Sequence, residues 1–274
     1  MMRGGERRAG AGVGGFRTAI GALLLLAASG AAAVAALYPR EGRRFMAEED
    51  FRRYPGAGVL MCRTEEGVPE RAAAAWLIGG RGLVVLNAHN FVDRKLRPTH
   101  PIDDCTFGIG EKEYAFETES LRFGFPPNAK ALNITDDWAL VRLRDLVDAD
   151  VAPQPIPDGP ALPTGLVSLH VVMVSPAGHS NFRRATSIEE CQIRQIDAPS
   201  EDGIRRARHD CNDGYGGSGS GIFSDDGRLV AMHSASLDMN SRRDFDMERH
   251  FGMALLFEGE LLDAIRQTLQ ADAR

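Results

Sequence analysis

The sequence predicts an all-β protein of two β-barrels followed by one C-terminal helix. Three observations lead to this fold class. Short apolar runs broken by turn residues dominate the chain, a proline-dense stretch divides it near the middle, and apolar residues recur at helical spacing only near the end. A length of 274 residues is enough for two small hydrophobic cores or one large one.

The first 36 residues are typical of an export signal. Residues 3–17 carry four arginines and one glutamate, an apolar run follows at Ala19–Leu37, and small residues stand at Ala33–Ala36. We therefore expect a signal peptide over residues 1–36 and a secreted or periplasmic protein. The apolar run also has about the 20 residues that span a bilayer. An uncleaved segment that anchors the protein to the membrane therefore stays open as the alternative.

The charge of the remaining chain argues against a nucleic-acid partner. Once those four arginines and one glutamate are set aside, 28 basic and 37 acidic residues leave a net charge of −9, without a long basic stripe. We expect Arg205, Arg206 and Arg208 on a solvated strand edge.

The motifs C-x-x-C and H-E-x-x-H do not occur, so the sequence predicts neither a metal site nor a cofactor. The expected state is a monomer that contacts a membrane only if its N-terminal segment is uncleaved.

The N-terminal barrel is predicted over residues 45–150. Its strands are indicated by two pairs of apolar runs around turn residues, which predict hairpins, and by one run in which apolar and polar residues alternate. These patterns occupy Ala75–Ile78 with Leu83–Leu86, Cys105–Ile109 with Tyr114–Glu117, and Asp137–Leu143.

A connector is predicted over residues 151–165, because prolines this dense cannot join a central sheet. They are Pro153, Pro155, Pro157, Pro160 and Pro163. The C-terminal barrel and the terminal helix then occupy residues 166–274. The patterns that predict them are a partly alternating run at Leu166–Val174, a hairpin of Gly221–Phe223 with Arg228–Ser234, and a helix at Glu258–Gln270 with Leu261, Leu262, Ile265 and Leu269 on one face.

All four cysteines follow the export signal, and an even number in an exported chain favours two disulfides. Four cysteines allow three pairings. The turn cluster Pro199–Gly203 lies midway between Cys191 and Cys211, and a hairpin folded there would place these two cysteines opposite each other. This suggests Cys191–Cys211 and leaves Cys62–Cys105.

Three short segments contain residues that could perform chemistry. His89 follows an apolar strand in "VVLNAHNF", Asp137 begins a strand in "DDWALVRL", and Ser218 lies in "GYGGSGSGIF". Each has an ordinary explanation alone: a linker serine, a packed histidine, a turn-capping aspartate. Together they fit nucleophilic catalysis, in which an imidazole takes the serine proton and a carboxylate fixes the imidazole tautomer. Asp136 competes for the carboxylate role, but Asp137 directly precedes Trp-Ala-Leu.

These segments resemble the motifs of the chymotrypsin-like (trypsin-like) serine peptidases, which carry them in the order His, Asp, Ser. The Ser-Gly-Ser form resembles the bacterial branch that includes glutamyl endopeptidases. The resemblance implies two six-stranded antiparallel β-barrels, with His89 and Asp137 from the first and Ser218 from the second. It implies an exported serine endopeptidase that acts on proteins or peptides through an acyl-enzyme intermediate. The sequence departs from the family where Gly217 replaces the usual Asp or Asn and Gly221 a common Pro.

The same resemblance implies the remaining site residues. The backbone amides of Gly216 and Ser218 would form the oxyanion hole. The pocket for the residue before the scissile bond would be built by Asn212, Asp213, His233, Ser234, Ala235 and Ser236. His233 matches the histidine with which glutamyl endopeptidases hold an acidic side chain, whereas Asp213 would favour Lys or Arg. We favour the acidic preference and keep the basic one open. The competing functional class is a catalytically inactive, protease-like secreted binding protein.

Overall fold

The computed structural model describes residues 38–40, 42–158, 162–177, 186–212, 217–236 and 243–272, without the side chains of Glu70 and Arg71. The chain divides into Met1–Ala33 and Val34–Arg274, and all described residues belong to the second unit. The predicted signal peptide or anchor, residues 1–36, therefore lies outside the described residues. Among those that are described, no helix has the length and hydrophobicity needed to cross a membrane.

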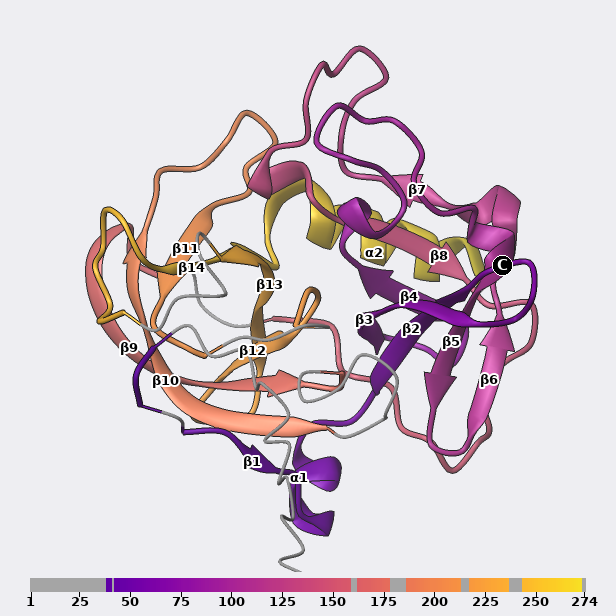
Figure 1. Cartoon of the computed structure of the whole chain (residues 1–274), viewed down its shortest axis with the longest axis horizontal. Helices are drawn as coiled ribbons and strands as arrows, with labels where there is room; N and C mark the ends of the chain where they lie inside the picture. The colour runs from indigo at the N-terminus through magenta and orange to yellow at the C-terminus, as the bar shows by residue number, and fades with distance from the viewer. Residues whose placement is uncertain are drawn as a thin grey trace, which may run out of the picture. The chain divides into compact units, whose positions relative to one another are not determined.

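The first half of the described chain forms a seven-stranded antiparallel sheet (Figure 1). The sheet curls until the end of β6 meets the end of β8, where Phe116 and Leu143 form an isolated bridge. Its order is β6-β5-β2-β3-β4-β8-β7. The strands are β2 (Ala57–Arg63), β3 (Pro69–Leu77), β4 (Leu83–Leu86), β5 (Cys105–Ile109), β6 (Lys112–Ala115), β7 (Arg122–Phe123) and β8 (Ala139–Arg142).

The second half forms a closed barrel of six strands, because β9 pairs with both β12 and β10. Its order is β10-β11-β14-β13-β12-β9, and the short strand β1 adds to the outer edge of β10. The strands are β1 (Arg44–Phe45), β9 (Gly165–Ser175), β10 (Ser187–Ile196), β11 (Arg206–His209), β12 (Gly221–Ser224), β13 (Leu229–Ser236) and β14 (Gly252–Leu256). The helices are α1 (Glu48–Arg53) and α2 (Gly259–Asp272).

The all-β, two-barrel architecture with a C-terminal helix is confirmed, with one difference in detail. The second barrel closes through a continuous strand ladder, whereas the first is a curled sheet joined by the Phe116–Leu143 bridge. The sequence also gave no sign of β1 or α1. Residue 45, where we expected the first barrel to begin, lies in β1 and pairs with Ser187 of the second barrel. Two residues are too few to show an alternating pattern, so only the pairing partner places them.

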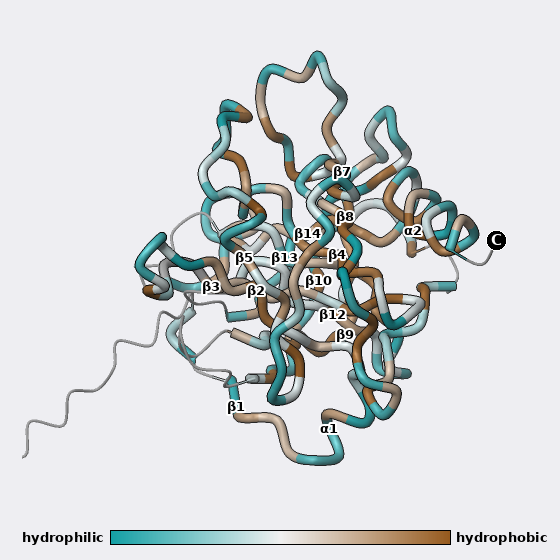
Figure 2. Tube along the Cα trace, turned by 90° about the vertical axis from the view of Figure 1, so that its right-hand side faces the viewer, coloured by the Kyte–Doolittle hydropathy of each residue, from teal (hydrophilic) through white to brown (hydrophobic). Residues whose placement is uncertain are grey.

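The hydrophobic core of the described residues has four parts, and the largest of them joins the two sheets. The smallest contains Val59, Met61, Ala72 and Ala177. Leu60 and Phe107 belong to a cluster inside the first sheet, and Ile193 and Ile222 to a cluster inside the second. The third cluster contains Trp76, Trp138, Val174, Phe223, Met232 and Leu261, from both sheets and α2. Figure 2 shows the hydrophobic residues gathered along the strands, while the projecting loops are mostly hydrophilic. The seam between the two barrels is therefore a packed core.

Disulfides join Cys62 to Cys105 and Cys191 to Cys211. This is the pairing that the hairpin argument suggested, because Pro199–Gly203 does connect β10 to β11 and their strands pair antiparallel. The Cys62–Cys105 bond links the neighbouring strands β2 and β5, and the Cys191–Cys211 bond links β10 to the segment just after β11. Cys62 lies directly opposite Cys105 in the β2–β5 pairing.

The expectation of a solvated arginine edge is wrong for Arg205. This side chain is 8% exposed, forms a two-pronged ion pair with Glu258 and also donates to the Leu162 carbonyl. The Glu258 carboxylate holds the pKa of Arg205 above its usual value. Arg206 and Arg208 are partly exposed and lie beside Asp197.

Candidate active site

Three segments that are distant in sequence bring His89, Asp137 and Ser218 together. His89 lies on a 3-10 turn, Ala88–Asn90, that follows β4, and Asp137 directly precedes Trp138 and β8. Because Leu86 at the end of β4 pairs with Ala139 at the start of β8, the two side chains meet at one end of this strand pair. Ser218 comes from the loop between β11 and β12 of the other barrel. The His89 Nε2 lies 2.8 Å from the Ser218 Oγ.

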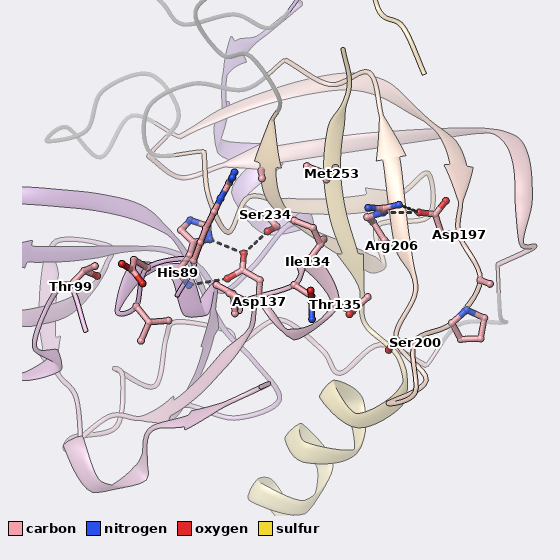
Figure 3. Close-up of a pocket in the computed structure, with 18 of the residues that line it drawn as sticks. His89, Thr99, Ile134, Thr135, Asp137, Asp197, Ser200, Arg206, Ser234 and Met253 are labelled. Atoms are coloured by element: carbon pink, nitrogen blue, oxygen red, sulfur yellow. Dashed lines mark hydrogen bonds and ion pairs between the residues drawn. The ribbon is translucent and has the colours of Figure 1, made fainter. Parts of the chain in front are cut away.

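The carboxylate of Asp137 is buried and orients the imidazole. Its Oδ2 lies 2.7 Å from the His89 Nδ1, and its Oδ1 accepts the His89 backbone N–H at 2.9 Å. The side chain of Asp137 is 3% exposed, and the Ser234 hydroxyl donates to the same Oδ2 (Figure 3). A carboxylate can only accept, so the His89 Nδ1 carries the hydrogen and the Nε2 of the neutral ring is left to accept from Ser218.

Asp136, the competing carboxylate, does not contact His89 in the part of the chain that is described. It accepts hydrogen bonds from Asn133 Nδ2 at 2.9 Å and from Thr135 Oγ1 at 3.2 Å. These contacts lie within its own 3-10 turn, Ile134–Asp136. The structure therefore brings Asp137 and not Asp136 to the imidazole.

The backbone that follows Ser218 is fixed against β3 of the first barrel. The Ser218 carbonyl accepts the Ala74 N–H at 2.7 Å, and the Gly219 carbonyl accepts the Trp76 indole N–H at 2.8 Å. Gly219 has φ +84°, and a Cβ there would lie 2.1 Å from the Ala74 carbonyl oxygen. Only glycine fits both this backbone conformation and this close approach.

The other end of the loop is equally constrained. The Ser220 hydroxyl donates to the Gly217 carbonyl at 2.6 Å and lies 2.7 Å from the Ser175 Oγ. A Cβ on Gly221 would lie 2.6 Å from Trp76 Cζ2, so the indole occupies the space that a side chain would need. Gly219 and Gly221 are thus required by contacts. From Gly217 to Gly221 the segment is an ordered loop and not a linker.

The residues predicted for the substrate pocket separate into distinct groups. Ser234 and Ala235 line a cleft of about 910 Å³ together with His89 and Asp137 (Figure 3). His233 is buried beside them in β13, and Ser236 ends that strand. Asn212 is 2% exposed, and its side chain is engaged by the N-terminal segment. Asp213 and Gly216 lie outside the described residues.

Ser234 owes its direction to a β-bulge. The pairing of β13 with β14 matches His233 with Ala254 and Ala235 with Met253, so Ser234 is one extra residue on β13. A bulge of this kind re-aims a side chain. Here it accompanies the contact of the Ser234 hydroxyl with Asp137. Ser234 therefore contacts the Asp137 carboxylate as well as lining the cleft.

Sequence reasoning missed His209. Its ring is fully buried and its Nε2 lies 2.9 Å from the His233 Nδ1. The Cys211 N–H donates to the His209 Nδ1 at 3.2 Å, so this nitrogen is an acceptor and the Nε2 carries the hydrogen. His209 therefore donates to His233, which in its neutral form then carries its own hydrogen on Nε2. The alternation Arg206-Ala207-Arg208-His209 is a sequence signal that could have placed His209 on the inner face of β11, but not beside His233.

The far wall of the cleft mixes apolar and charged groups. Val92, Ile134 and Met253 supply apolar surface, and Arg206 donates to Asp197 at 2.6 Å (Figure 3). The cleft thus begins at the His89–Asp137 pair and continues past β13 toward β11. Its walls come from both barrels.

The fold is the chymotrypsin-like fold of serine proteases. Among solved structures, a Glu endopeptidase in complex with MPD matches with a TM-score of 0.58 and 13% identity, over 85% of this chain and 98% of that chain. An active-form protease of M. tuberculosis matches at 14% identity with a TM-score of 0.48, over 76% of this chain and 79% of that one. No protein-family model and no curated protein sequence matches the chain. The resemblance inferred from the three motifs is confirmed for the fold.

Proposed function

We propose that this protein is a serine endopeptidase in which Ser218 is the nucleophile, His89 the general base and Asp137 the residue that orients His89. One observation carries the proposal: the hydrogen-bonded chain from Asp137 Oδ2 through the His89 ring to Ser218 Oγ, at 2.7 and 2.8 Å. Both distances lie within the reach needed for proton transfer. The chain of contacts joins two barrels, and the loop that carries Ser218 is held on both sides.

The reaction follows from this geometry. The Ser218 Oγ attacks the peptide carbonyl carbon while its proton moves to His89 Nε2, which gives a tetrahedral oxyanion. The C–N bond then breaks as His89 returns the proton to the leaving amine, and an ester to Ser218 remains. Water, deprotonated by His89, hydrolyses that ester and restores the serine. The amides of Ser218 and Gly216 would donate to the oxyanion, and one such donor contributes about 3–4 kcal/mol.

For the substrate we propose a preference for an acidic residue before the scissile bond. Supporting this is the orientation of the buried His209–His233 pair, which leaves the hydrogen of neutral His233 on Nε2, where it could donate to a carboxylate. One solved structure with the same fold, which matches over 85% of this chain, is a Glu endopeptidase. The substrate strand would pair along Ser234–Ser236. The alternative is a preference for Lys or Arg, which the carboxylate of Asp213 would produce if it lined the pocket.

We further propose that the protein acts outside the cytoplasm. The two disulfides support this, because such bonds persist in oxidising compartments such as the periplasm or the extracellular medium. The basic and apolar N-terminal sequence is what an exported chain requires.

Labelling with a fluorophosphonate tests the nucleophile. We expect the wild-type protein to gain the mass of one phosphonyl group on Ser218 and the Ser218→Ala variant to gain none. Labelling elsewhere, or a folded wild type that resists the reagent, would contradict the proposal and favour the inactive binding protein. Profiling on a peptide library then measures the preference before the scissile bond, with Glu and Asp expected ahead of Lys and Arg.

A further inference from the structure

A short N-terminal segment crosses the outside of the second barrel. We call Tyr38–Phe45, without Glu41, the strap. Its last two residues form β1 and pair with Ile188 and Ser187 of β10. Gly42 passes so close to Glu189 that a Cβ would lie 2.6 Å from its Oε1. The strap therefore follows the barrel surface closely from end to end.

Tyr38, at the start of the strap, is bound to both ends of the turn His209–Asn212. Its hydroxyl donates to the His209 carbonyl at 3.1 Å, and its backbone N–H donates to Asn212 Oδ1 at 2.9 Å. Its ring makes edge contacts with Phe245 and His250, at centroid distances of 5.9 and 5.5 Å. Tyr38 is only 6% exposed. A residue at the beginning of the exported chain is thus part of the barrel.

Asn212 joins the strap to the barrel wall. Its Nδ2 donates to the Arg40 carbonyl at 2.7 Å and to Glu189 Oε1 at 2.8 Å, while its own N–H donates to Glu189 Oε2 at 2.6 Å. Together with the bond from Tyr38, these contacts use both amide hydrogens and the amide oxygen of Asn212. This side chain holds chain segments together and does not line the cleft.

The turn held by the strap carries His209, the donor to His233. The Cys191–Cys211 disulfide and the Cys211 N–H on His209 Nδ1 fix the middle of the turn. The strap fixes the two ends of the turn: Tyr38 binds the His209 carbonyl, and Tyr38 and Arg40 bind the side chain of Asn212. Any movement of the turn would move His209 and break its 2.9 Å contact with His233, whereas His89, Asp137 and Ser218 make no contact with the strap among the described residues.

We propose that the strap is a positioning element for substrate recognition: Tyr38 and Asn212 hold the turn so that the His209–His233 pair keeps its orientation. The inference rests on the proposed protease function and on its acidic preference. The strap's role also limits where a signal peptide could be cleaved. Cleavage must fall before Tyr38 if the protein is to keep its preference for acidic substrates.

The test uses the full chain with Tyr38→Phe, which keeps the ring but removes the bond to His209, and with Asn212→Ala, which releases the strap. The control is Arg52→Ala, because Arg52 lies on α1 with 69% of its side chain exposed. Two quantities are measured for each: the rate of fluorophosphonate labelling at Ser218, and the ratio of kcat/KM for two peptides that differ only in Glu or Gln before the scissile bond. Circular dichroism and Tm report folding.

For Tyr38→Phe we expect the Glu-to-Gln ratio to fall about two- to tenfold, as for loss of one hydrogen bond, with labelling within about twofold of wild type. Asn212→Ala should lower the ratio further, and Arg52→Ala should change neither quantity. A general loss of stability would lower kcat/KM for both peptides equally and leave the Glu-to-Gln ratio unchanged.

A ratio that stays within twofold of wild type in the folded variants would overturn the proposal. If Asn212→Ala does not fold, Tyr38→Phe decides alone, because its ring packing is retained. A wild type that labels but does not prefer Glu removes the acidic preference, and the strap's role with it. A wild type that fails to label contradicts the protease function itself, so the separate failures remain distinguishable.

Discussion

At the scale of single residues, the loop after Ser218 is fitted to the first barrel with no spare space. Gly219 and Gly221 approach Ala74 and Trp76 so closely that a Cβ at either position would lie within 2.6 Å of them. At position 221 the indole of Trp76 occupies the space that a side chain would need. Gly219 and Gly221 are therefore explained by close contact with the first barrel.

Gly219→Ala is expected to displace the backbone beside Ser218. The new methyl group would meet the Ala74 carbonyl in addition to an unfavourable φ of +84°. We expect a stability loss of roughly 2–4 kcal/mol and a labelling rate lower by about 100-fold. Gly227→Ala is the matched control. Gly227 has a similar φ of +82°, but the atoms nearest to its added Cβ would be 3.7 Å away, at ordinary contact distance. Equal effects in the two variants would show that φ strain alone is responsible.

Asp137→Asn is expected to lower kcat by about 10⁴-fold, because an amide cannot hold the imidazole in the same tautomer. The fold should be retained, since the side chain keeps its shape. Asp136→Asn is the control, because this neighbouring carboxylate contacts Asn133 and Thr135 instead of His89. Steady-state kinetics on one acidic peptide measures both. A similar loss in both variants would contradict the role that we assign to Asp137.

At the scale of elements, β1 pairs with β10 of the second barrel and is joined to α1 by an ion pair. Arg44 of β1 forms a two-pronged ion pair with Asp50 of α1, at 2.5 and 3.0 Å. Asp50 also accepts the Ala47 N–H at the start of α1. The Arg44 hydrogen bonds, aided by the Ala47 N–H, hold the pKa of Asp50 below its usual value. This carboxylate therefore stabilises the folded state while it is ionised.

The pH dependence of this contribution follows from its sign. Because the pKa of Asp50 is lower in the folded state than its ordinary value, the stabilisation is present above that ordinary value and is lost as pH falls through the folded one. Asp50→Asn should lower the free energy of unfolding by about 1 kcal/mol at pH 7, since Arg44 is 57% exposed. The difference from wild type should shrink below about pH 4.

Thermal unfolding of both proteins from pH 7 to pH 3 measures this difference. Glu48→Gln serves as the control, because the Glu48–Arg52 pair on the same helix is exposed on both sides, at 90% and 69%. We expect that variant to differ from wild type by less than about 0.5 kcal/mol. A difference for Asp50→Asn that grows as the pH falls would contradict the assignment.

At the scale of the whole described unit, the two barrels share a hydrophobic core. Trp76 of the first sheet packs on Phe223 of the second, with ring centroids 5.1 Å apart. The helix α2 follows the second barrel in sequence but bonds to the first, through Arg122 to Glu260 and Arg142 to Asp272. Residues of the candidate active site lie on both sides of this seam, so the site depends on the seam staying closed.

The shared core predicts that the two barrels unfold together. Calorimetry should show one transition whose calorimetric and van't Hoff enthalpies agree. Leu60→Ala, which alters only the core of the first barrel, should lower the stability by about 2–5 kcal/mol and shift the whole peak. Splitting into two peaks, with one left at the wild-type temperature, would show instead that the barrels are independent.

Local patterns in the sequence determined much of this protein. Alternating and apolar runs predicted the hairpins β3–β4, β5–β6 and β12–β13, and helical spacing predicted α2, because each pattern depends on neighbours in sequence. The turn at Pro199–Gly203 suggested the Cys191–Cys211 pairing for the same reason. The three motifs around His89, Asp137 and Ser218 suggested the fold family because they occur together and in the order His, Asp, Ser.

Only the tertiary structure decided the contacts that join distant segments. His89 and Ser218 are 129 residues apart, and Tyr38 and Asn212 are 174 apart. No local pattern records such partners, so the sequence could not show that Asn212 holds the strap, that His209 donates to His233, or that β1 belongs to the second barrel. These contacts form because closing the barrels buries polar groups, and a buried polar group needs a partner wherever in the chain that partner lies.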